Sequence, residues 1–429
     1  MSTALFATLI IFILIFLLRM PISLGMLAAG CVYFLINGSD MGSVANHVMN
    51  TYYSNYVIIA VPLFIFTANV MNSGKVTEMV FKFASGLSGG KRGALGHVNV
   101  IASLIFSGMT GSAIADASGL GKMEIDAMKK AGYDDGFSCA ITAASATIGP
   151  IFPPSIPLVM YAMLSGASVG ALFLGGMIPA ILVCVALMIY VSVVSKARNY
   201  PAEERIPFRQ FIRFTLQAIP ALLTPAILLA GIYTGIMTPT EAGAVAAIYA
   251  IIVAFLAYKA MSFKGLIAIV KDTIKDTGSV SLMVGAASVI SYIVAREQVA
   301  TKVGDLVLGF TTNPYVFLLI VNVIILILGM FIDTSTIQLV FVPIMIPIAS
   351  ALGINLVHFG LVVTLNMMIG LSTPPFGMLL FITAGISGTS LKSIMKEIMW
   401  PIAAMLAVLL VITFIPDVVL FLPRLVGML

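Results

Sequence analysis

Two short segments of this chain place hydroxyl side chains and glycines in the middle of long apolar stretches. The first reads Ser107-Gly-Met-Thr-Gly-Ser, and the second reads Gly329-Met-Phe-Ile-Asp-Thr-Ser-Thr. Each is followed by an apolar stretch interrupted at a Gly-x-x-x-Pro-Pro element, which starts at Gly149 or at Gly370. Proline lacks an N–H group and clashes with the preceding helical turn, so backbone carbonyls become free there. Free carbonyls and hydroxyls are neutral oxygen ligands, and they predict one cation site beside each interruption.

Both segments also carry or precede an aspartate, Asp116 in the first case and Asp333 in the second. An ionisable group at membrane depth is costly unless it is functional or covered. Asp116 could instead cap the second helix of its hairpin, whereas Asp333 lies nearer its tip and is the better candidate for binding substrate or for coupling. The N–H groups at the start of broken helices favour an anion. Most hydroxyls in membrane helices bond their own backbone, and we expect the tip hydroxyls to be exceptions.

The composition requires these segments to lie in a membrane. Of the 429 residues, 60% are hydrophobic and only 9% are charged, whereas about a quarter of a soluble domain is charged. We therefore predict an all-α integral membrane protein with about ten transmembrane helices. The spans are predicted near residues 4–18, 22–37, 57–73, 137–164, 171–195, 216–235, 240–258, 278–295, 357–386 and 398–422. Residues 95–128 and 314–351 each hold two apolar limbs around a polar tip, and we predict a re-entrant hairpin in each.

Three landmarks recur in the same order in the two halves of the chain. Pro21-Ile-Ser-Leu-Gly and Pro239-Thr-Glu-Ala-Gly are 218 residues apart, the two aspartates are 217 apart, and the two Gly-x-x-x-Pro-Pro elements are 221 apart. This recurrence predicts two repeats, residues 1–214 and 215–429. A single Pro-Pro in a membrane helix is usually a kink, but two in register behind hairpins favour a functional site at the repeat interface.

The distribution of Lys and Arg predicts the orientation. With these spans, 19 of the 22 basic residues fall on one side, Arg19 and Arg205 among them, and Arg296, Lys302 and Arg424 fall on the other. The positive-inside rule makes the first side cytoplasmic. Both termini are then predicted to be periplasmic and the two repeats to have inverted topology. The basic residues lie singly or in small groups between apolar runs, so they do not suggest nucleic acid.

The sequence offers no chemistry for an enzyme or an ATP-driven pump. It contains no Gly-x-x-x-x-Gly-Lys-[Ser/Thr] loop, zinc motif or nucleophile elbow. Cys31, Cys139 and Cys184 fit neither a metal site nor a disulfide framework. We expect no catalytic residue, no transition metal and no cofactor, with an ion gradient as the energy source. Segments 75–90 and 296–310 mix charged and apolar residues, and are either amphipathic helices on the membrane surface or loops.

Together the motifs resemble those of one transporter family. Phe106-Ser-Gly-Met-Thr-Gly-Ser-Ala-Ile-Ala-Asp-Ala-Ser-Gly-Leu-Gly resembles a hairpin in the large membrane subunit of tripartite ATP-independent periplasmic (TRAP) transporters. Ala131-Gly-Tyr, Ile148-Gly-Pro-Ile-Phe-Pro-Pro-Ser and Gly370-Leu-Ser-Thr-Pro-Pro-Phe-Gly are similar to further motifs of that subunit. The resemblance covers essentially the whole chain. It implies a sodium-driven importer of organic acids in the bacterial inner membrane, with an elevator mechanism in which a hairpin-bearing module slides against a scaffold.

The resemblance also implies partners and ligand sites. The partners would be a separate four-span small membrane subunit and a periplasmic substrate-binding protein. Sodium, the coupling ion, would bind at Ser107, Thr110, Ser145, Gly149, Gly329, Gly370 and Thr373. A small organic anion would lie between the cations, near Ser112, Ser155 and Asp333. Sialic acid is favoured over C4-dicarboxylates, because Ile-Asp-Thr-Ser-Thr in the second hairpin departs from the dicarboxylate members.

Three other functions can be weighed against this one. A divalent-anion/sodium symporter of similar architecture would act without a binding protein, but such symporters carry Ser-Asn-Thr at the hairpin tips, and that tripeptide is absent from the sequence. A membrane-embedded enzyme would need convergent His, Glu or Cys residues at membrane depth. A purely structural membrane subunit would not need paired helix breaks.

Overall fold

The chain folds into helices joined by turns. We describe a computed structural model that covers residues 2–18, 20–72, 74–202 and 206–429, so Arg19 and Arg205, which entered the charge count, lie outside the described residues. Among the described residues the only strand-like pairing is an isolated bridge between Arg92 and Ala202. The all-α prediction is therefore confirmed.

Helices fill both predicted repeats of the chain. The first half contains α1 (Thr3–Leu17), α2 (Ile22–Ile36), α3 (Gly42–Ser54), η1 (Tyr56–Ile59), α4 (Ala60–Met71), α5 (Gly74–Ser88), α6 (Ala94–Thr110), α7 (Ala113–Lys130), α8 (Asp135–Ala146), α9 (Ile156–Ser165) and α10 (Val169–Ala197). The second half contains α11 (Phe208–Tyr233), α12 (Pro239–Ile252), the π-helix η2 (Val253–Ala257), α13 (Phe263–Arg296), α14 (Val299–Phe310), α15 (Pro314–Phe331), α16 (Thr334–Val340), α17 (Val342–Ala351), α18 (Leu356–Leu371), α19 (Met378–Ser387), α20 (Leu391–Phe414) and α21 (Pro416–Leu425).

Several of these helices are long and apolar enough to cross a membrane. Within the described residues six meet that test, namely α10, α11, α12 with η2, α13, α15 and α20. The number rises to eight if the α3–α4 pair, bent by 75°, and the α16–α17 pair, bent by 53°, each count as one span. The other predicted spans lie on shorter apolar helices, such as α1 and α2, or on pairs interrupted at the Pro-Pro elements.

Two predicted spans had wrong limits. The span near 398–422 is not one helix, because α20 ends at Phe414 and Pro416 starts α21. The residue before a proline is driven out of the helical region, and Ile415 accordingly has φ −120° and ψ 81°. The span near 278–295 is the apolar part of α13, which begins at Phe263 after Ser262 accepts a capping hydrogen bond from Gly265 N.

Both segments of mixed charge are helices, so the loop alternative for them is wrong. Residues 75–90 coincide with α5, and residues 296–310 coincide with α14. Val76, Val80 and Ala84 lie on one face of α5, at four-residue spacing, and are fully buried. They pack in a cluster shared with α6 and α11. This face of α5 is therefore covered by protein.

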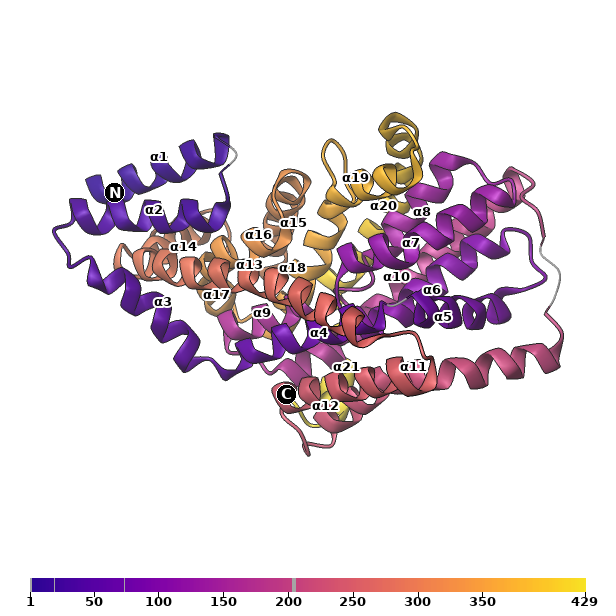
Figure 1. Ribbon diagram of the computed structural model, residues 1–429. Helices are drawn as coiled ribbons and strands as arrows, with labels where there is room; N and C mark the ends of the chain where they lie inside the picture. Colours follow the sequence, from indigo (N-terminus) through magenta and orange to yellow (C-terminus); the bar gives the residue numbers. More distant parts are fainter. Residues whose placement is uncertain (1, 19, 73, 203–205) are drawn as a thin grey trace.

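Apart from α5 and α14, the helices can be divided into two groups that each combine both halves of the sequence. We call α6–α10 with α15–α21 the hairpin group, because it holds both predicted hairpins; its members pack as α7 on α8, α8 on α20, α10 on α20, α7 on α19 and α15 on α18. We call α1–α4 with α11–α13 the outer group, in which α13 packs on α2, α3 and α4. Figure 1 shows α1 and α2 near one end of the molecule, α5–α8 near the other, and α13 running between them.

Candidate functional site

The first hairpin has a tight tip between α6 and α7. Gly111 ends α6 with φ 61°, a left-handed conformation that glycine adopts without steric cost. Ser112 then begins α7, and its side chain accepts a hydrogen bond from Ala115 N. A Cβ on Gly111 would lie 2.3 Å from Pro154 O and 3.2 Å from the Ser155 Cα. The tip therefore lies directly against the interruption between α8 and α9.

That interruption lies between the end of α8 at Ala146 and the start of α9 at Ile156. Ser155 begins α9, where its buried hydroxyl accepts from Leu158 N at 3.2 Å and donates to Pro150 O. A Cβ on Gly149 would lie only 2.7 Å from Asp116 Oδ2. The carboxyl group of the hairpin thus packs directly against the glycine of the interrupted span.

Asp116 does not cap its helix, because Ser112 fills that position. It is 2% exposed, and its Oδ1 accepts a hydrogen bond from Thr110 Oγ1 at 2.5 Å. Its Oδ2 has no hydrogen-bond partner among the described residues. Buried polar atoms in native proteins are rarely left without a partner. The capping alternative for Asp116 is therefore wrong, and its Oδ2 is a buried polar atom without a partner among the described residues.

The tip hydroxyl of Ser107 bonds its own backbone, contrary to the expectation for tip hydroxyls, whereas Thr110 and Thr336 donate to the carboxylates of Asp116 and Asp333. Ser107 Oγ donates to Leu104 O at 2.6 Å, and Thr373 Oγ1 donates to Ile369 O at 2.6 Å. Thr110 Oγ1 also lies 3.4 Å from Phe106 O. A helical carbonyl one turn back is the nearest acceptor for such a hydroxyl. Donation uses only the hydrogen, so the lone pairs of each oxygen stay available to a cation.

The second tip and its interruption meet through glycines. A Cβ on Gly370 would lie 2.7 Å from the Cα of Gly329, and a Cβ on Gly329 would lie 3.0 Å from the Cα of Gly370. These two backbones therefore touch. Thr373 follows in the interruption between α18 and α19, where its N–H donates to Gly370 O at 2.9 Å.

A buried polar network that the sequence interpretation missed lies behind the first tip. Asn99 on α6 donates to Glu124 Oε2 at 2.8 Å and to Thr142 Oγ1 at 2.7 Å. Its Oδ1 accepts from Ser145 Oγ at 2.7 Å, and Ser145 accepts from Ser103 Oγ at 3.0 Å. These five residues are at most 2% exposed. The predicted cation-site residue Ser145 is thus held to α6 by Asn99.

The second repeat has a corresponding contact. Asn366 on α18 donates to Asn322 Oδ1 on α15 at 3.0 Å, and Asn322 donates to Thr413 Oγ1 at 3.0 Å. Ser145 precedes Gly149 by four residues, and Asn366 precedes Gly370 by four. Polar residues that recur at the repeat spacing inside apolar limbs were the signal that could have revealed both networks.

The predicted substrate residues all stand at helix starts. Ser112 begins α7, Ser155 begins α9, and Asp333 begins α16, with its carboxylate accepting from Thr336 N at 3.0 Å and Thr336 Oγ1 at 2.5 Å. The first two lie together, because Gly111 contacts Ser155. Asp333 joins them only indirectly: α16 packs on α9, and Gln338 donates to Pro157 O at 2.6 Å.

A cavity of about 460 Å³ separates the two helix groups beside α9 and α16. Its lining comes from α3, α9, α13, α16 and α17, and from the residue before η1. The lining residues are His47, Thr51, Asn55, Met163, Leu164, Val284, Ala287, Ser288, Ser291, Tyr292, Leu339 and Pro343. None of the ten predicted site residues lines it. The cavity thus lies between helices of the hairpin group and helices of the outer group.

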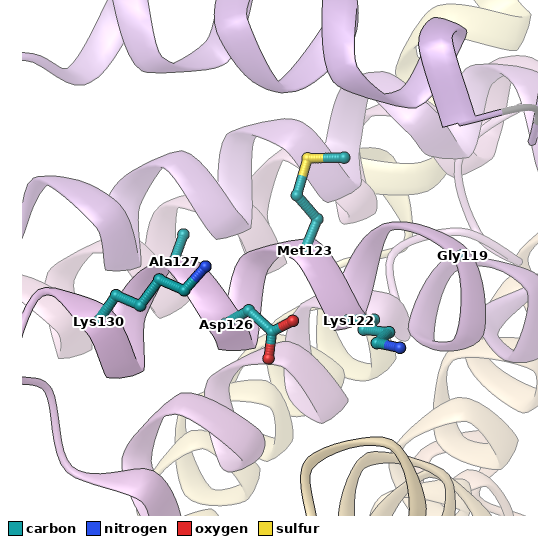
Figure 2. Close-up of a pocket in the computed structure, with 6 residues that line it drawn as sticks. All are labelled: Gly119, Lys122, Met123, Asp126, Ala127 and Lys130. Atoms are coloured by element: carbon teal, nitrogen blue, oxygen red, sulfur yellow. The ribbon is translucent and has the colours of Figure 1, made fainter.

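Figure 2 shows a second cavity, of about 530 Å³, along one side of α7. All six labelled side chains come from this helix: Gly119, Lys122, Met123, Asp126, Ala127 and Lys130. They follow the three- and four-residue spacing of one helix face. A single helix face with charges of both signs is an open surface, and it contains none of the predicted site residues.

Comparison with known proteins relates this arrangement to a family. The sequence model of the family described as the DctM component of tripartite ATP-independent periplasmic transporters matches residues 9–418. The chain belongs to this family. As a TRAP large permease, it is a multi-pass membrane transport component and not an enzyme, and it works with a substrate-binding protein. The symporter that acts without a binding protein is thereby disfavoured.

Three relatives carry names for their substrates. The sialic acid TRAP transporter large permease protein SiaM of Vibrio cholerae is 40% identical over 95% of each chain. The sialic acid TRAP transporter permease protein SiaT of Haemophilus influenzae is 38% identical, over 99% of this chain and 69% of its own length. The C4-dicarboxylate TRAP transporter large permease protein DctM of Pseudomonas aeruginosa is 33% identical over 95% of each chain.

A solved structure is similar to this TRAP permease in fold alone. The YdaH transporter of Alcanivorax borkumensis, described as having an unusual topology, aligns with a TM-score of 0.61 over 86% of each chain, at 13% sequence identity. Such a low identity says nothing of shared substrate or ions. The structural similarity does support the helix arrangement described above.

Proposed function

We propose that this TRAP large permease imports an organic acid with sodium as the coupling ion, and that the acid is sialic acid. The observation that carries the proposal is the pairing of each hairpin tip with a helix interruption. Gly111 lies against Pro154 and Ser155 in the first repeat, and Gly329 lies against Gly370 in the second. Two such junctions supply two oxygen-rich sites at helix breaks, the usual place for coupling ions in secondary transporters.

Each proposed sodium site combines backbone carbonyls with a hydroxyl. The first would use Ser107, Thr110, Ser145 and Gly149, with the carboxyl group of Asp116 as a neighbour on the Gly149 side. The last carbonyls of a helix lack partners within that helix, and α6 and α8 both end here. The second would use Gly329, Gly370 and Thr373, where α15 and α18 end.

The proposed substrate site lies between these two junctions. Ser112 and Ser155 stand at the starts of α7 and α9, where N–H groups favour a carboxylate. Asp333 at the start of α16 would meet hydroxyl or ammonium groups of the substrate. Relatives named for sialic acid are 38–40% identical, against 33% for the relative named for C4-dicarboxylates, which is why sialic acid is preferred.

The two helix groups suggest how transport proceeds. The hairpin group holds both proposed cation sites and the substrate residues, and the cavity of about 460 Å³ separates part of it from the outer group. We propose that the hairpin group moves as one body against the outer group, as an elevator. The periplasmic binding protein would deliver substrate, and a separate four-span small subunit would complete the complex.

We also propose that both termini face the periplasm of the bacterial inner membrane, as the Lys and Arg distribution indicates. Cysteines introduced at Ser2 and Leu429, in a background without Cys31, Cys139 and Cys184, should react with an impermeant thiol reagent added to intact spheroplasts. Labelling of either site only after the membrane is opened would contradict this orientation.

The coupling ion and the substrate are tested together in proteoliposomes that contain the chain, its small subunit and its binding protein. Uptake of labelled N-acetylneuraminate should require an inward sodium gradient and no internal ATP. Equal uptake when potassium replaces sodium would show that the ion assignment is wrong. Stronger competition by succinate than by unlabelled N-acetylneuraminate would instead overturn the substrate assignment and leave the ion assignment intact.

A further inference from the structure

A third cavity, of about 300 Å³, lies where α5, α6 and α10 meet, away from the proposed transport site. Its lining residues are Leu87, Ser88, Lys91, His97, Ile101, Val185, Met188, Ile189 and Ser192. The polar residues gather at one end, because His97 near the start of α6 lies 3.2 Å from Ser192 Oγ near the end of α10. Val185 lies two turns away along α10, or about 10 Å at 1.5 Å per residue. The cavity therefore has a polar head and an apolar tail.

Two buried polar atoms in this head have no protein partner. Ser88 is 5% exposed and His97 is 6% exposed, and Ser88 Oγ and His97 Nδ1 lack hydrogen-bond partners among the described residues. Ser192 donates its hydrogen to Met188 O at 2.9 Å, so His97 Nε2 is the donor in the His97–Ser192 contact. Nδ1 is then left as an acceptor. A ligand that both accepts from a serine hydroxyl and donates to an imidazole would satisfy both atoms.

The charge at the polar end of the cavity indicates whether the ligand is an anion or a cation. Among the described residues that line the cavity, Lys91 alone carries a permanent charge, and its side chain is exposed. Lys91 is in the turn before α6, at the end of the apolar stretch, where a lipid headgroup would lie. An anion is therefore expected beside Ser88 and Lys91.

The apolar tail continues along α10. A neighbouring groove of about 310 Å³ between α10 and α20 shares Ile189 with this cavity. Its lining is entirely apolar, and consists of Leu182, Ala186, Ile189, Ala404, Ala407, Val408 and Val411. A soluble anion would leave this groove unused, whereas an acyl chain attached to the anion would fill it.

We propose that the junction of α5, α6 and α10 binds an anionic phospholipid with a hydroxyl-bearing headgroup. The phosphate lies at Lys91 and Ser88, a headgroup hydroxyl donates to His97 Nδ1, and an acyl chain runs past Ile189 along α10. Phosphatidylglycerol has all three features. The site is separate from the residues proposed to bind sodium or substrate, so this inference does not depend on the transport proposal.

Quenching of a single tryptophan by brominated lipid tests the site in the full-length chain. Trp400, the one native tryptophan, is replaced by Phe, and a reporter is introduced as Ile189→Trp. A matched reporter, Ile248→Trp, lies on α12, and both isoleucines are 60% exposed. One lysine near a lipid headgroup contributes about 1 kcal/mol, or about fivefold in affinity. Brominated phosphatidylglycerol should therefore quench the Ile189→Trp reporter with about fivefold higher apparent affinity than brominated phosphatidylcholine. The two lipids should quench the Ile248→Trp reporter equally.

Substitutions of the lysine complete the test. Lys91→Ala should reduce the fivefold preference to near one, Lys91→Arg should retain it, and Lys264→Ala, at an exposed lysine on α13, should not change it. Equal quenching by both lipids with Lys91 intact would overturn the proposal. Relief of quenching by excess glycerol 1-phosphate would show that the ligand is a soluble phosphate and would also overturn it. Native mass spectrometry of the chain without a reporter checks the result, since wild type should retain one phosphatidylglycerol more than Lys91→Ala.

Discussion

At each hairpin junction, one hydroxyl occupies the same local geometry. Ser107 and Thr373 both donate to a carbonyl of their own helix at 2.6 Å and keep their lone pairs free. If these oxygens hold sodium, truncation removes one ligand at a depth where water is scarce. The expected loss is about 1–3 kcal/mol, or roughly one to two decades in sodium affinity. Ser107→Ala and Thr373→Ala should each raise the half-saturating sodium concentration for uptake by that factor.

Matched controls for these variants exist in the chain. Ser85 Oγ donates to Phe81 O at 2.9 Å, and Thr234 Oγ1 donates to Ala230 O at 2.7 Å, away from both junctions. Ser85→Ala and Thr234→Ala remove the same kind of backbone contact and should leave the sodium dependence unchanged. Unaltered sodium dependence in both Ser107→Ala and Thr373→Ala would mean that the paired breaks are only kinks.

The glycine contact at the second junction gives a prediction about packing. A Cβ at Gly370 would lie 2.7 Å from the Cα of Gly329, which is backbone and cannot rotate away. Overpacking of this kind typically costs about 1–3 kcal/mol. Gly370→Ala should lower the thermal unfolding midpoint and abolish uptake. Gly385→Ala on α19, where a Cβ would meet nothing within 4 Å, should change neither, and an unfolding midpoint for Gly370→Ala equal to wild type would refute the contact.

At the scale of helices, an ion-pair cluster joins the two repeats at the ends of α8, α10 and α20. Arg198 donates to Asp134 Oδ2 at 2.9 Å and to Glu397 Oε2 at 2.8 Å, and Tyr200 Oη donates to Asp134 Oδ2 at 2.6 Å. The Tyr200 hydroxyl, with Arg198, holds the pKa of Asp134 below its ordinary value of 3.8. A carboxyl group whose pKa is lowered in the folded state stabilises the fold at pH values above its ordinary pKa. That stability is lost as the pH falls through the folded-state pKa.

The pH dependence of unfolding tests this cluster. Because the Asp134 side chain is 59% exposed, solvent screening limits its contribution to less than about 1 kcal/mol. Tyr200→Phe should therefore slightly lower the unfolding midpoint at neutral pH, and the difference from wild type should shrink below about pH 4. Tyr315→Phe, at an exposed ring on α15, serves as the control. A difference that stays constant with pH would show that Tyr200 contributes only through packing.

At the scale of the whole molecule, one contact between the helix groups can test their relative motion. Gly119 on α7 belongs to the hairpin group, and Asn72 at the end of α4 belongs to the outer group. A Cβ on Gly119 would lie 2.6 Å from Asn72 Cγ, so cysteines at both positions are close enough for a disulfide. Oxidation of Asn72→Cys/Gly119→Cys should stop uptake, and reduction should restore it.

A disulfide within the hairpin group is the matched control. Cys139 Sγ on α8 lies 3.1 Å from Ser387 Oγ on α19, so Ser387→Cys can pair with the native cysteine. If the hairpin group moves as one body, oxidation of this variant should leave uptake unchanged. Full activity of the oxidised Asn72→Cys/Gly119→Cys variant would rule out relative motion at that contact.

The hairpins and the helix interruptions could be predicted from the sequence, and the repeat of residues 1–214 and 215–429 stays a prediction. Apolar runs, glycines and adjacent prolines act locally, because they decide whether a backbone can stay helical in lipid. The C-terminal end of α20 and the start of α13 were harder to predict. Pro416 interrupts an apolar run, and Ser262 starts α13 well before its apolar run begins. In both cases a local residue marks the helix limit, but the extent of the apolar run alone puts that limit in the wrong place.

Which polar atoms meet was decided only by the tertiary structure. Ser145 was predicted as a cation ligand, but its link to Asn99, and that of Asn99 to Glu124, join residues on three helices. The sequence left Asp116 open between a helix cap and a functional group, whereas packing directs its Oδ2 at Gly149. The chain's composition and breaks thus determined a helical membrane protein with paired junctions, and the resemblance of its motifs indicated the TRAP family. The partners of each buried donor and acceptor depended on distances between helices, which local sequence does not encode.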